Sequence, residues 1–265
     1  MCQNAEEAMI MQRESEDAGR VLIEAFHTIY HPATIRARDI VRSGVIGAVA
    51  DVQVVHLGDF LRGRTSKDDD VRLDVTLGGG CLMDLGCYDI QAIRFLTDTE
   101  PRCLSATAEP FVDDALVDDA MQASFSLSNG GTASLSCSWK AADKSGPTQI
   151  RITGDKGWLE CGWGGYNEGN EIRTKIGDAD VVTESVDGPF PNTRTTMFYQ
   201  LTAFEAEVRS QEAAGEGACG KPWSYTMKSC PADAVANMAV LDAVYTAAGQ
   251  GPRPSTNPAP PKGKL

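Results

Sequence analysis

The middle of the chain alternates hydrophobic and polar residues with a period of two, as β-strands do. From residue 121 to 139, apolar side chains alternate with mostly serine or threonine on both sides of an Asn129-Gly130-Gly131 turn. This pattern predicts a hairpin with one apolar face and one serine-rich face. The same reasoning predicts further strands at 149–153, 158–161, 171–175 and 181–185. Together the segments indicate a largely antiparallel open sheet of about six strands.

Helical patterns surround the predicted strands. Pro32 opens a helix predicted at 33–43, and two longer amphipathic helices are predicted at 195–209 and 232–248. We expect helices to pack on the apolar face of the sheet, so that residues 27–250 form one α+β domain. The serine-rich face is then either exposed to solvent or packed against the sheet of a second subunit.

The two ends of the chain follow other patterns. A helix is predicted at 5–17 with Asn4 as its cap, and the short apolar run 21–26 predicts a strand covered on both faces, as in a parallel sheet. Residues 1–26 would thus be the last helix and strand of a larger α/β unit. The segment 251–265 is rich in proline and lysine and has nothing to bury, so we expect a disordered tail.

Composition and charge narrow the possible functions. The 265 residues carry a formal net charge of -13, which disfavours nucleic acid as a partner. No apolar run approaches the ~18 residues of a membrane span, and the first residues do not form a signal peptide, so we expect a cytoplasmic protein without membrane contact. Eight scattered cysteines without a C-x-x-C pair indicate reduced thiols.

The segment 78–88, GGGCLMDLGCY, contains the candidate chemistry. Its three glycines allow a close approach of the backbone to a ligand or another chain, and they precede a helix predicted at 81–97. Asp84 and Tyr88 are four residues apart on that helix, so a carboxylate and a phenol project from one face. Such a pair can transfer a proton at a hydroxyl carbon. The alternative is structural, with Asp84 favoured by the helix dipole and Tyr88 hydrogen-bonded in the core.

The motif GGG-x-L-x-D-x-G-x-Y resembles that of the substrate domain in the glucose-fructose oxidoreductase, inositol dehydrogenase and rhizopine catabolism (Gfo/Idh/MocA) family. It resembles most the branch of D-xylose dehydrogenases and dihydrodiol dehydrogenases. Further similarity extends over nearly the whole chain, at 24–26, 30–32, 41–47, 198–200 and 241–245. The resemblance implies that Tyr88 is the catalytic acid or base and Asp84 its partner. It implies oxidation of a sugar such as D-xylose, or of a trans-dihydrodiol, by hydride transfer to NAD or NADP.

The resemblance also predicts a missing part. Family members carry an N-terminal Rossmann domain, and residues 1–26 resemble only its end, so we expect most of that domain and its catalytic lysine to be absent before Met1. A free tyrosine has a pKa near 10 and usually needs a nearby cation to act as a base at neutral pH. Without the lysine we therefore expect activity to suffer, and without the Rossmann domain we expect this chain not to bind NAD or NADP tightly. The one G-x-G-x-x-G match, at 215–220, lies in no βαβ unit and is interpreted as a loop.

Further residues are candidates for substrate contact. The resemblance implies that His31 lies at the floor of the substrate cleft, while Arg72 and Asp74 are close enough to the glycines to reach a polyol hydroxyl. His27, His31 and Glu24 span a strand end and a helix start, so we predict no metal site. The serine-rich sheet face suggests a homodimer. The alternative to a dehydrogenase domain is a non-catalytic binding or oligomerisation module, or a truncated product without activity.

Overall fold

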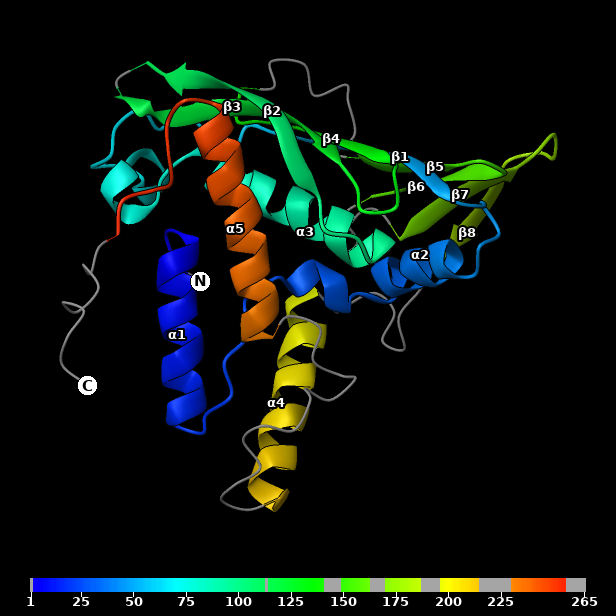
Figure 1. Ribbon diagram of the computed structural model, residues 1–265, viewed down its shortest axis with the longest axis horizontal. Coiled ribbons are helices and arrows are strands. Elements are labelled where there is room, and N and C mark those ends of the chain that lie inside the picture. Colours follow the sequence, from blue (N-terminus) through cyan, green and yellow to red (C-terminus); the bar gives the residue numbers. More distant parts are fainter. Residues whose placement is uncertain are drawn as a thin grey trace.

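One sheet organises the protein, and the computed structural model describes residues 2–112, 114–140, 149–162, 170–186, 196–214 and 230–255. Among these residues the sheet has eight strands in the order β2-β3-β4-β1-β5-β6-β7-β8 (Figure 1). The strands are β1 (Val49–Leu57), β2 (Arg102–Phe111), β3 (Asp114–Ser126), β4 (Thr132–Ser138), β5 (Gln149–Gly154), β6 (Gly157–Cys161), β7 (Glu171–Ile176) and β8 (Val182–Ser185). Only β1 and β4 of these run parallel, so the prediction of a largely antiparallel sheet is confirmed.

The predicted count of about six strands is wrong, because β1 and β2 were not counted. In β1 the apolar positions are partly consecutive, at Val54 and Val55, which blurs the period of two. In β2 the pairing with β3 shifts register near Cys103 and again near Pro110, so the alternation along this strand is broken. A single continuous period therefore identifies neither strand.

Helices cover one face of the sheet, and the other face stays open (Figure 1). The α-helices are α1 (Ala5–Asp17), α2 (Pro32–Arg42), α3 (Cys87–Thr97), α4 (Thr196–Ala214) and α5 (Pro231–Ala247). Shorter helical turns lie at His27–Tyr30, Val71–Leu73, Val75–Leu77 and, with π geometry, at Leu82–Gly86. None of the helices in the described ranges is long and apolar enough to cross a membrane.

The apolar face of the predicted hairpin forms the core, as the alternating pattern predicts. Its inward side chains are no more than 6% exposed: Met121, Ala123, Phe125, Leu127, Ala133, Leu135, Cys137 and Trp139. They join one buried cluster with Ile90 and Ile93 of α3 and with Leu241 and Val244 of α5. The chain passes from β1 through α3 to β2, and α3 packs against β1 and β4 of the sheet.

The first segment is only partly as predicted. Asn4 caps α1 by accepting a hydrogen bond from the amide of Glu7 at 3.0 Å, and α1 packs beside α5. The strand predicted at 21–26 is wrong, because no described strand pairs with these residues. The described contacts of this extended segment are with helices, and Gln200 of α4 donates to the carbonyl of Glu24 at 3.3 Å.

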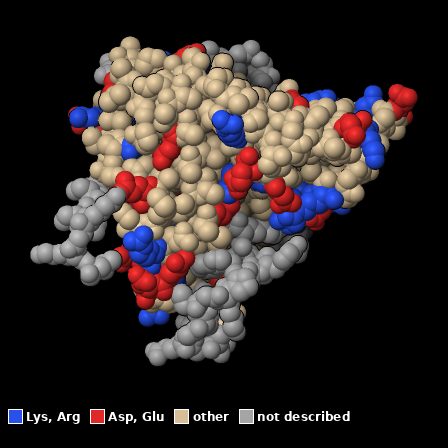
Figure 2. All heavy atoms as spheres, viewed as in Figure 1, with Lys and Arg blue, Asp and Glu red and all other residues tan. Residues whose placement is uncertain are grey.

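Acidic side chains gather over α1, as Figure 2 shows.

The segment after α5 is a second departure from the prediction. The expectation that it buries nothing is wrong for Arg253, which is 3% exposed and forms an ion pair with Asp118 of β3. The glycine-rich match at 215–220 and the tail beyond 255 lie outside the described residues.

Two glycines of the GGG motif are required by contacts within the chain. A Cβ at Gly79 would lie 2.5 Å from the carbonyl oxygen of Arg72, and one at Gly80 would lie 2.1 Å from a carboxylate oxygen of Asp118. Gly80 also has a φ of 131°, which other residues rarely adopt. The close contacts that Gly79 and Gly80 permit are therefore with other residues of the same chain.

Gly80→Ala should lower the free energy of unfolding by about 3 kcal/mol, because the new methyl group meets a buried carboxylate and the φ is strained. Gly44→Ala is the matched control, since Gly44 also has a positive φ but no atom within 4 Å of a Cβ. It should cost only about 1 kcal/mol. Urea unfolding followed by circular dichroism measures both, and equal costs would contradict the steric explanation.

Candidate active site

A pocket of about 250 Å³ opens where the start of α3 meets residues 24–26 and α5. Asp84 and Tyr88 both line it, so the structure brings the predicted pair together. The rest of the wall includes Glu24, Phe26, Met83 and Met238. Polar groups that can bind hydroxyls thus lie beside apolar surface, a combination common in sites for small molecules.

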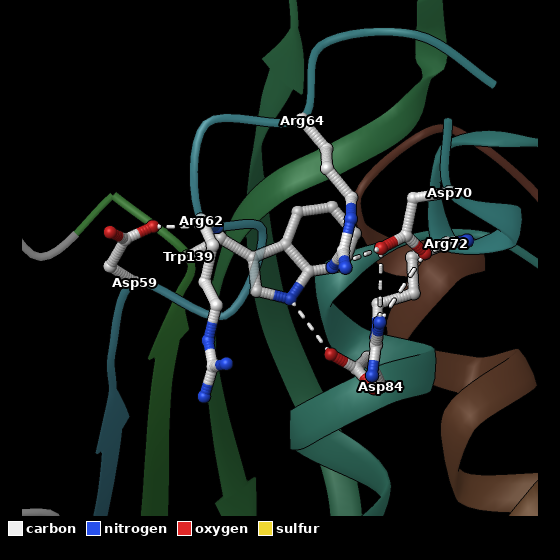
Figure 3. Close-up of polar contacts among 7 residues, drawn as sticks. All are labelled: Asp59, Arg62, Arg64, Asp70, Arg72, Asp84 and Trp139. Atoms are coloured by element: carbon white, nitrogen blue, oxygen red, sulfur yellow. Dashed lines mark hydrogen bonds and ion pairs between the residues drawn. The ribbon is translucent and has the colours of Figure 1, made fainter. Parts of the chain in front are cut away.

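Asp84 is held in a fixed orientation by two partners (Figure 3). The indole of Trp139 donates to one carboxylate oxygen at 3.0 Å, and Nε of Arg72 lies 2.9 Å from the other. Trp139 is only 2% exposed at the end of the predicted hairpin, whereas the Asp84 side chain is 21% exposed. Each carboxylate oxygen has a second lone pair, so Asp84 can still accept a hydrogen bond from a ligand in the pocket.

Arg72 is itself oriented by the loop before the glycines. Its Nη1 lies 3.1 Å from a carboxylate oxygen of Asp70, which also contacts Arg64 at 3.2 Å (Figure 3). Hydrogen bonding to Asp84 raises the pKa of Arg72, so the guanidinium stays charged. Arg72, a predicted site residue, therefore does not line the pocket itself and contributes to the site by pairing with Asp84.

The structure does not place Asp74 in the pocket wall. Its carboxylate accepts hydrogen bonds from the amide of Thr76 at 2.8 Å and from the hydroxyl of Thr76 at 2.6 Å. These bonds lower the pKa of Asp74. Asp74 thus caps the turn at Val75–Leu77, and its contact with substrate stays a prediction.

Aromatic rings surround Tyr88. The ring of Phe26 lies edge-on with its centroid 5.2 Å away, and the ring of His27 lies 5.6 Å away. The imidazole of His27 hydrogen-bonds with the hydroxyl of Thr196 at the start of α4 at 2.6 Å. These contacts restrict the side chain of Tyr88 to the side of α3 that faces the pocket.

His31 lies outside the lining of the pocket. It is 3% exposed, and its Nδ1 accepts a hydrogen bond from the amide of Ala33 at 3.2 Å, which caps α2. Its ring lies 5.5 Å from the ring of Tyr199. His31 thus has a structural role here, and its place at the cleft floor stays a prediction.

Two residues of the site were not proposed from the sequence. Trp139 was assigned only to the apolar face of the hairpin, although a buried indole N–H needs an acceptor and so signals a polar neighbour. Glu24 was named only as part of the family resemblance and as a possible metal ligand, yet it lines the pocket. In the described part of the chain, no group of three His, Cys, Asp or Glu side chains is arranged to hold a metal ion.

The described residues do not form a dinucleotide site. Such a site needs a strand that leads through a glycine-rich turn into a helix. Among the described elements, the Gly78–Gly80 turn follows a short helical turn and packs against Arg72 and Asp118. The glycines of this motif therefore do not form a phosphate-binding turn in the described structure.

With the sheet, the helices on one face and the pocket described, the chain can be compared with known proteins. Residues 34–160 match the family model of the GFO/IDH/MocA C-terminal domain. The chain is 29% identical over 251 residues to D-xylose 1-dehydrogenase (NADP(+)) 2 of Haloferax volcanii, across 94% of this chain and 68% of that protein. It is 28% identical over 139 residues to trans-1,2-dihydrobenzene-1,2-diol dehydrogenase of Xenopus tropicalis, across 52% and 39% of the two chains.

The fold is similar to that of a solved inositol dehydrogenase homolog complexed with NAD+ from Azotobacter vinelandii. The TM-score is 0.80 at 17% identity, over 95% of this chain and 69% of that chain. Residues 34–160 thus match the model of the GFO/IDH/MocA C-terminal domain family, the family that the motif resembles.

The buried histidine at the α2 cap predicts a pH dependence of stability. Burial lowers the pKa of His31, so its contribution to the free energy of unfolding is complete above its ordinary pKa and is lost as the pH falls below it. His31→Asn keeps an acceptor for the amide of Ala33 but cannot take up a proton.

Urea unfolding between about pH 7.5 and pH 5.5 should therefore show a flatter dependence in His31→Asn, by up to about 1 kcal/mol per pH unit. The unmodified chain, in which His27 also titrates with a lowered pKa, is the reference. If the free energy of unfolding depends on pH in the same way in both proteins, the assignment of His31 as a buried histidine with a lowered pKa is contradicted.

Proposed function

We propose that this chain binds a polyol, either a cyclic sugar such as D-xylose or a trans-dihydrodiol, and provides the proton-transferring residue for its oxidation. The observation that carries the proposal is that Asp84 and Tyr88 line one pocket while Arg72 and Trp139 fix Asp84. The names of the relatives support the same substrate classes, since they include a xylose dehydrogenase and a dihydrodiol dehydrogenase.

The chemistry assigned to the chain concerns the hydroxyl proton. Oxidation of a hydroxyl carbon breaks a C–H and an O–H bond, and the carbon passes its hydride to an acceptor. Tyr88 in its phenolate form accepts the proton of the reacting hydroxyl and becomes the neutral phenol, while Asp84 accepts a hydrogen bond from the substrate and orients it. Arg72 compensates the charge of Asp84, so that the carboxylate remains in place when substrate enters.

NAD or NADP is the hydride acceptor in this proposal. The support is the name of the Haloferax volcanii relative, which specifies NADP(+), and the NAD+ in the Azotobacter vinelandii complex. Residues 27–250 would be the substrate domain, and residues 1–26, of which 24–26 line the pocket, would be the end of a nucleotide-binding domain. A non-catalytic module is not favoured, because the relatives and structural neighbours named above are oxidoreductases.

The open face of the sheet is proposed to bind a second copy of the chain. Ser105, Ser124 and Ser134 lie in register across β2, β3 and β4, and Gln53 of β1 continues the row. They line a shallow hollow of about 440 Å³. Analytical ultracentrifugation decides this point, and a monomer at micromolar concentration would contradict it. We further propose a cytoplasmic location, supported by the free cysteines in the described residues.

The test of the proposal is Tyr88→Phe. With a nucleotide-binding domain fused ahead of Met1, and with NAD or NADP and D-xylose or a dihydrodiol supplied, kcat should fall by about 10²- to 10⁴-fold, because the group that accepts the proton is lost while the ring still fills the pocket. The affinity for the polyol, measured by calorimetry, should change little. Tyr199→Phe is the matched control, since Tyr199 lies against His31 outside the pocket wall. Unchanged turnover in Tyr88→Phe, or no binding of any polyol, would contradict the proposal.

A further inference from the structure

Three buried polar side chains meet behind the turn that carries Asp84. They are Asp118 of β3, Tyr245 of α5 and Arg253 after α5, and we call them the Asp118 cluster. Nη2 of Arg253 lies 2.6 Å from Oδ1 of Asp118, and the hydroxyl of Tyr245 donates to the same oxygen at 3.0 Å. The guanidinium lies over the Tyr245 ring, 3.8 Å from its centroid. The ion-paired side chains are 2% and 0% exposed, and no member of the cluster lines the pocket.

The cluster is connected to the site through one amide. Oδ2 of Asp118 accepts a hydrogen bond from the amide of Leu82 at 2.7 Å. Leu82 opens the π-helical turn, and Asp84 follows two residues later. Because the first amides of a helix have no acceptor within the helix, Asp118 acts as a cap supplied by another element.

The contact between cluster and turn leaves no free space. A Cβ at Gly80 would lie 2.1 Å from Oδ1 of Asp118, 2.6 Å from Nη2 of Arg253 and 2.8 Å from the hydroxyl of Tyr245. The amide of Asp84 in turn donates to the carbonyl of Gly80 at 3.0 Å. A displacement of the cluster is therefore transmitted to the backbone of the turn.

Arg253 is the cation that lets Asp118 act as an ionised cap. Burial raises the pKa of Asp118, and the charge of Arg253 opposes this effect. An ionised carboxylate buried without a partner would be strongly unfavourable, and a protonated one is a weaker acceptor for the amide of Leu82. The backbone around Arg253 is fixed as well, since the side chain of Asn4 donates to the carbonyl of Arg253 at 2.9 Å and to the hydroxyl of Ser255 at 2.9 Å.

We propose that Arg253 is a positioning residue for Asp84. By pairing with Asp118 it keeps the acceptor of the Leu82 amide in place, and the capped turn then holds Asp84 at its distance from Tyr88. The consequence for substrate binding rests on the proposed function, whereas the consequence for the turn does not.

The first experiment compares amide hydrogen exchange by NMR in the unmodified chain, Arg253→Met and Arg94→Met. Exchange of the Leu82 and Asp84 amides should become about tenfold faster in Arg253→Met, while the amides of β5 and β6 keep their rates. Arg94→Met is the control, because Arg94 is also a buried, ion-paired arginine, with Glu100 and Asp233 as its partners, but does not contact the cap. Arg94→Met should leave the exchange rate of the Leu82 amide unchanged.

The second experiment is a rescue. In Asp118→Asn/Arg253→Met, the amide oxygen of Asn can accept from Leu82 and its NH₂ group can donate to Tyr245, so the cap is restored without either charge. Exchange at Leu82 should return to within about threefold of the unmodified rate. Should Arg253→Met not fold, Arg253→Lys, which keeps the charge but has fewer donors, takes its place and should show an intermediate rate.

Unchanged Leu82 exchange in the single variant, or fast exchange in a folded double variant, would overturn the proposal. The affinity for D-xylose, measured by calorimetry, should fall about fivefold in Arg253→Met and recover in the double variant. If the unmodified chain binds no polyol, the proposed function fails, while the exchange rates still decide whether Arg253 positions the turn.

Discussion

No side chain fits at positions 79 and 80, and the candidate site depends on this steric constraint. Gly79 lies against the backbone of Arg72, so the charged loop and the turn before α3 are in direct contact. This contact lets the guanidinium of Arg72 reach Asp84. Gly80 lies against the Asp118 cluster, so the same turn is also fixed to β3 and to the segment after α5. The glycines thus set the direction of α3, and with it the positions of Asp84 and Tyr88.

Local patterns predicted much of the fold, whereas contacts distant in sequence could not be predicted. The hairpin around Asn129, the helices and the shared face of Asp84 and Tyr88 follow from short-range periodicity. The strand predicted at 21–26 does not form, because a strand needs a neighbouring strand whose backbone groups pair with its own. The bond of Trp139 to Asp84 and the ion pair of Arg253 with Asp118 join residues 55 and 135 positions apart, and no local pattern contains them.

The polar groups of the pocket suit a hydroxyl-rich ligand. Two carboxylates, Asp84 and Glu24, lie in its wall, and Asp84 is paired with Arg72. Hydroxyl groups of a ligand can donate to carboxylate oxygens. The apolar side chains of Phe26, Met83 and Met238 can pack against the C–H face of a sugar or a diene ring. The chain spans 68% of the length of the xylose dehydrogenase that it matches.

The most direct measurement of the central claim is an NMR titration of the isotope-labelled chain with D-xylose and a trans-dihydrodiol. The account predicts that the amide shifts of Glu24, Asp84 and Tyr88 change together and saturate at one affinity. The amides along the row of Ser124 and Ser134 on the open sheet face should not change. Shifts confined to that open face, or none at the pocket with either ligand, would contradict the assignment of the pocket as a polyol site.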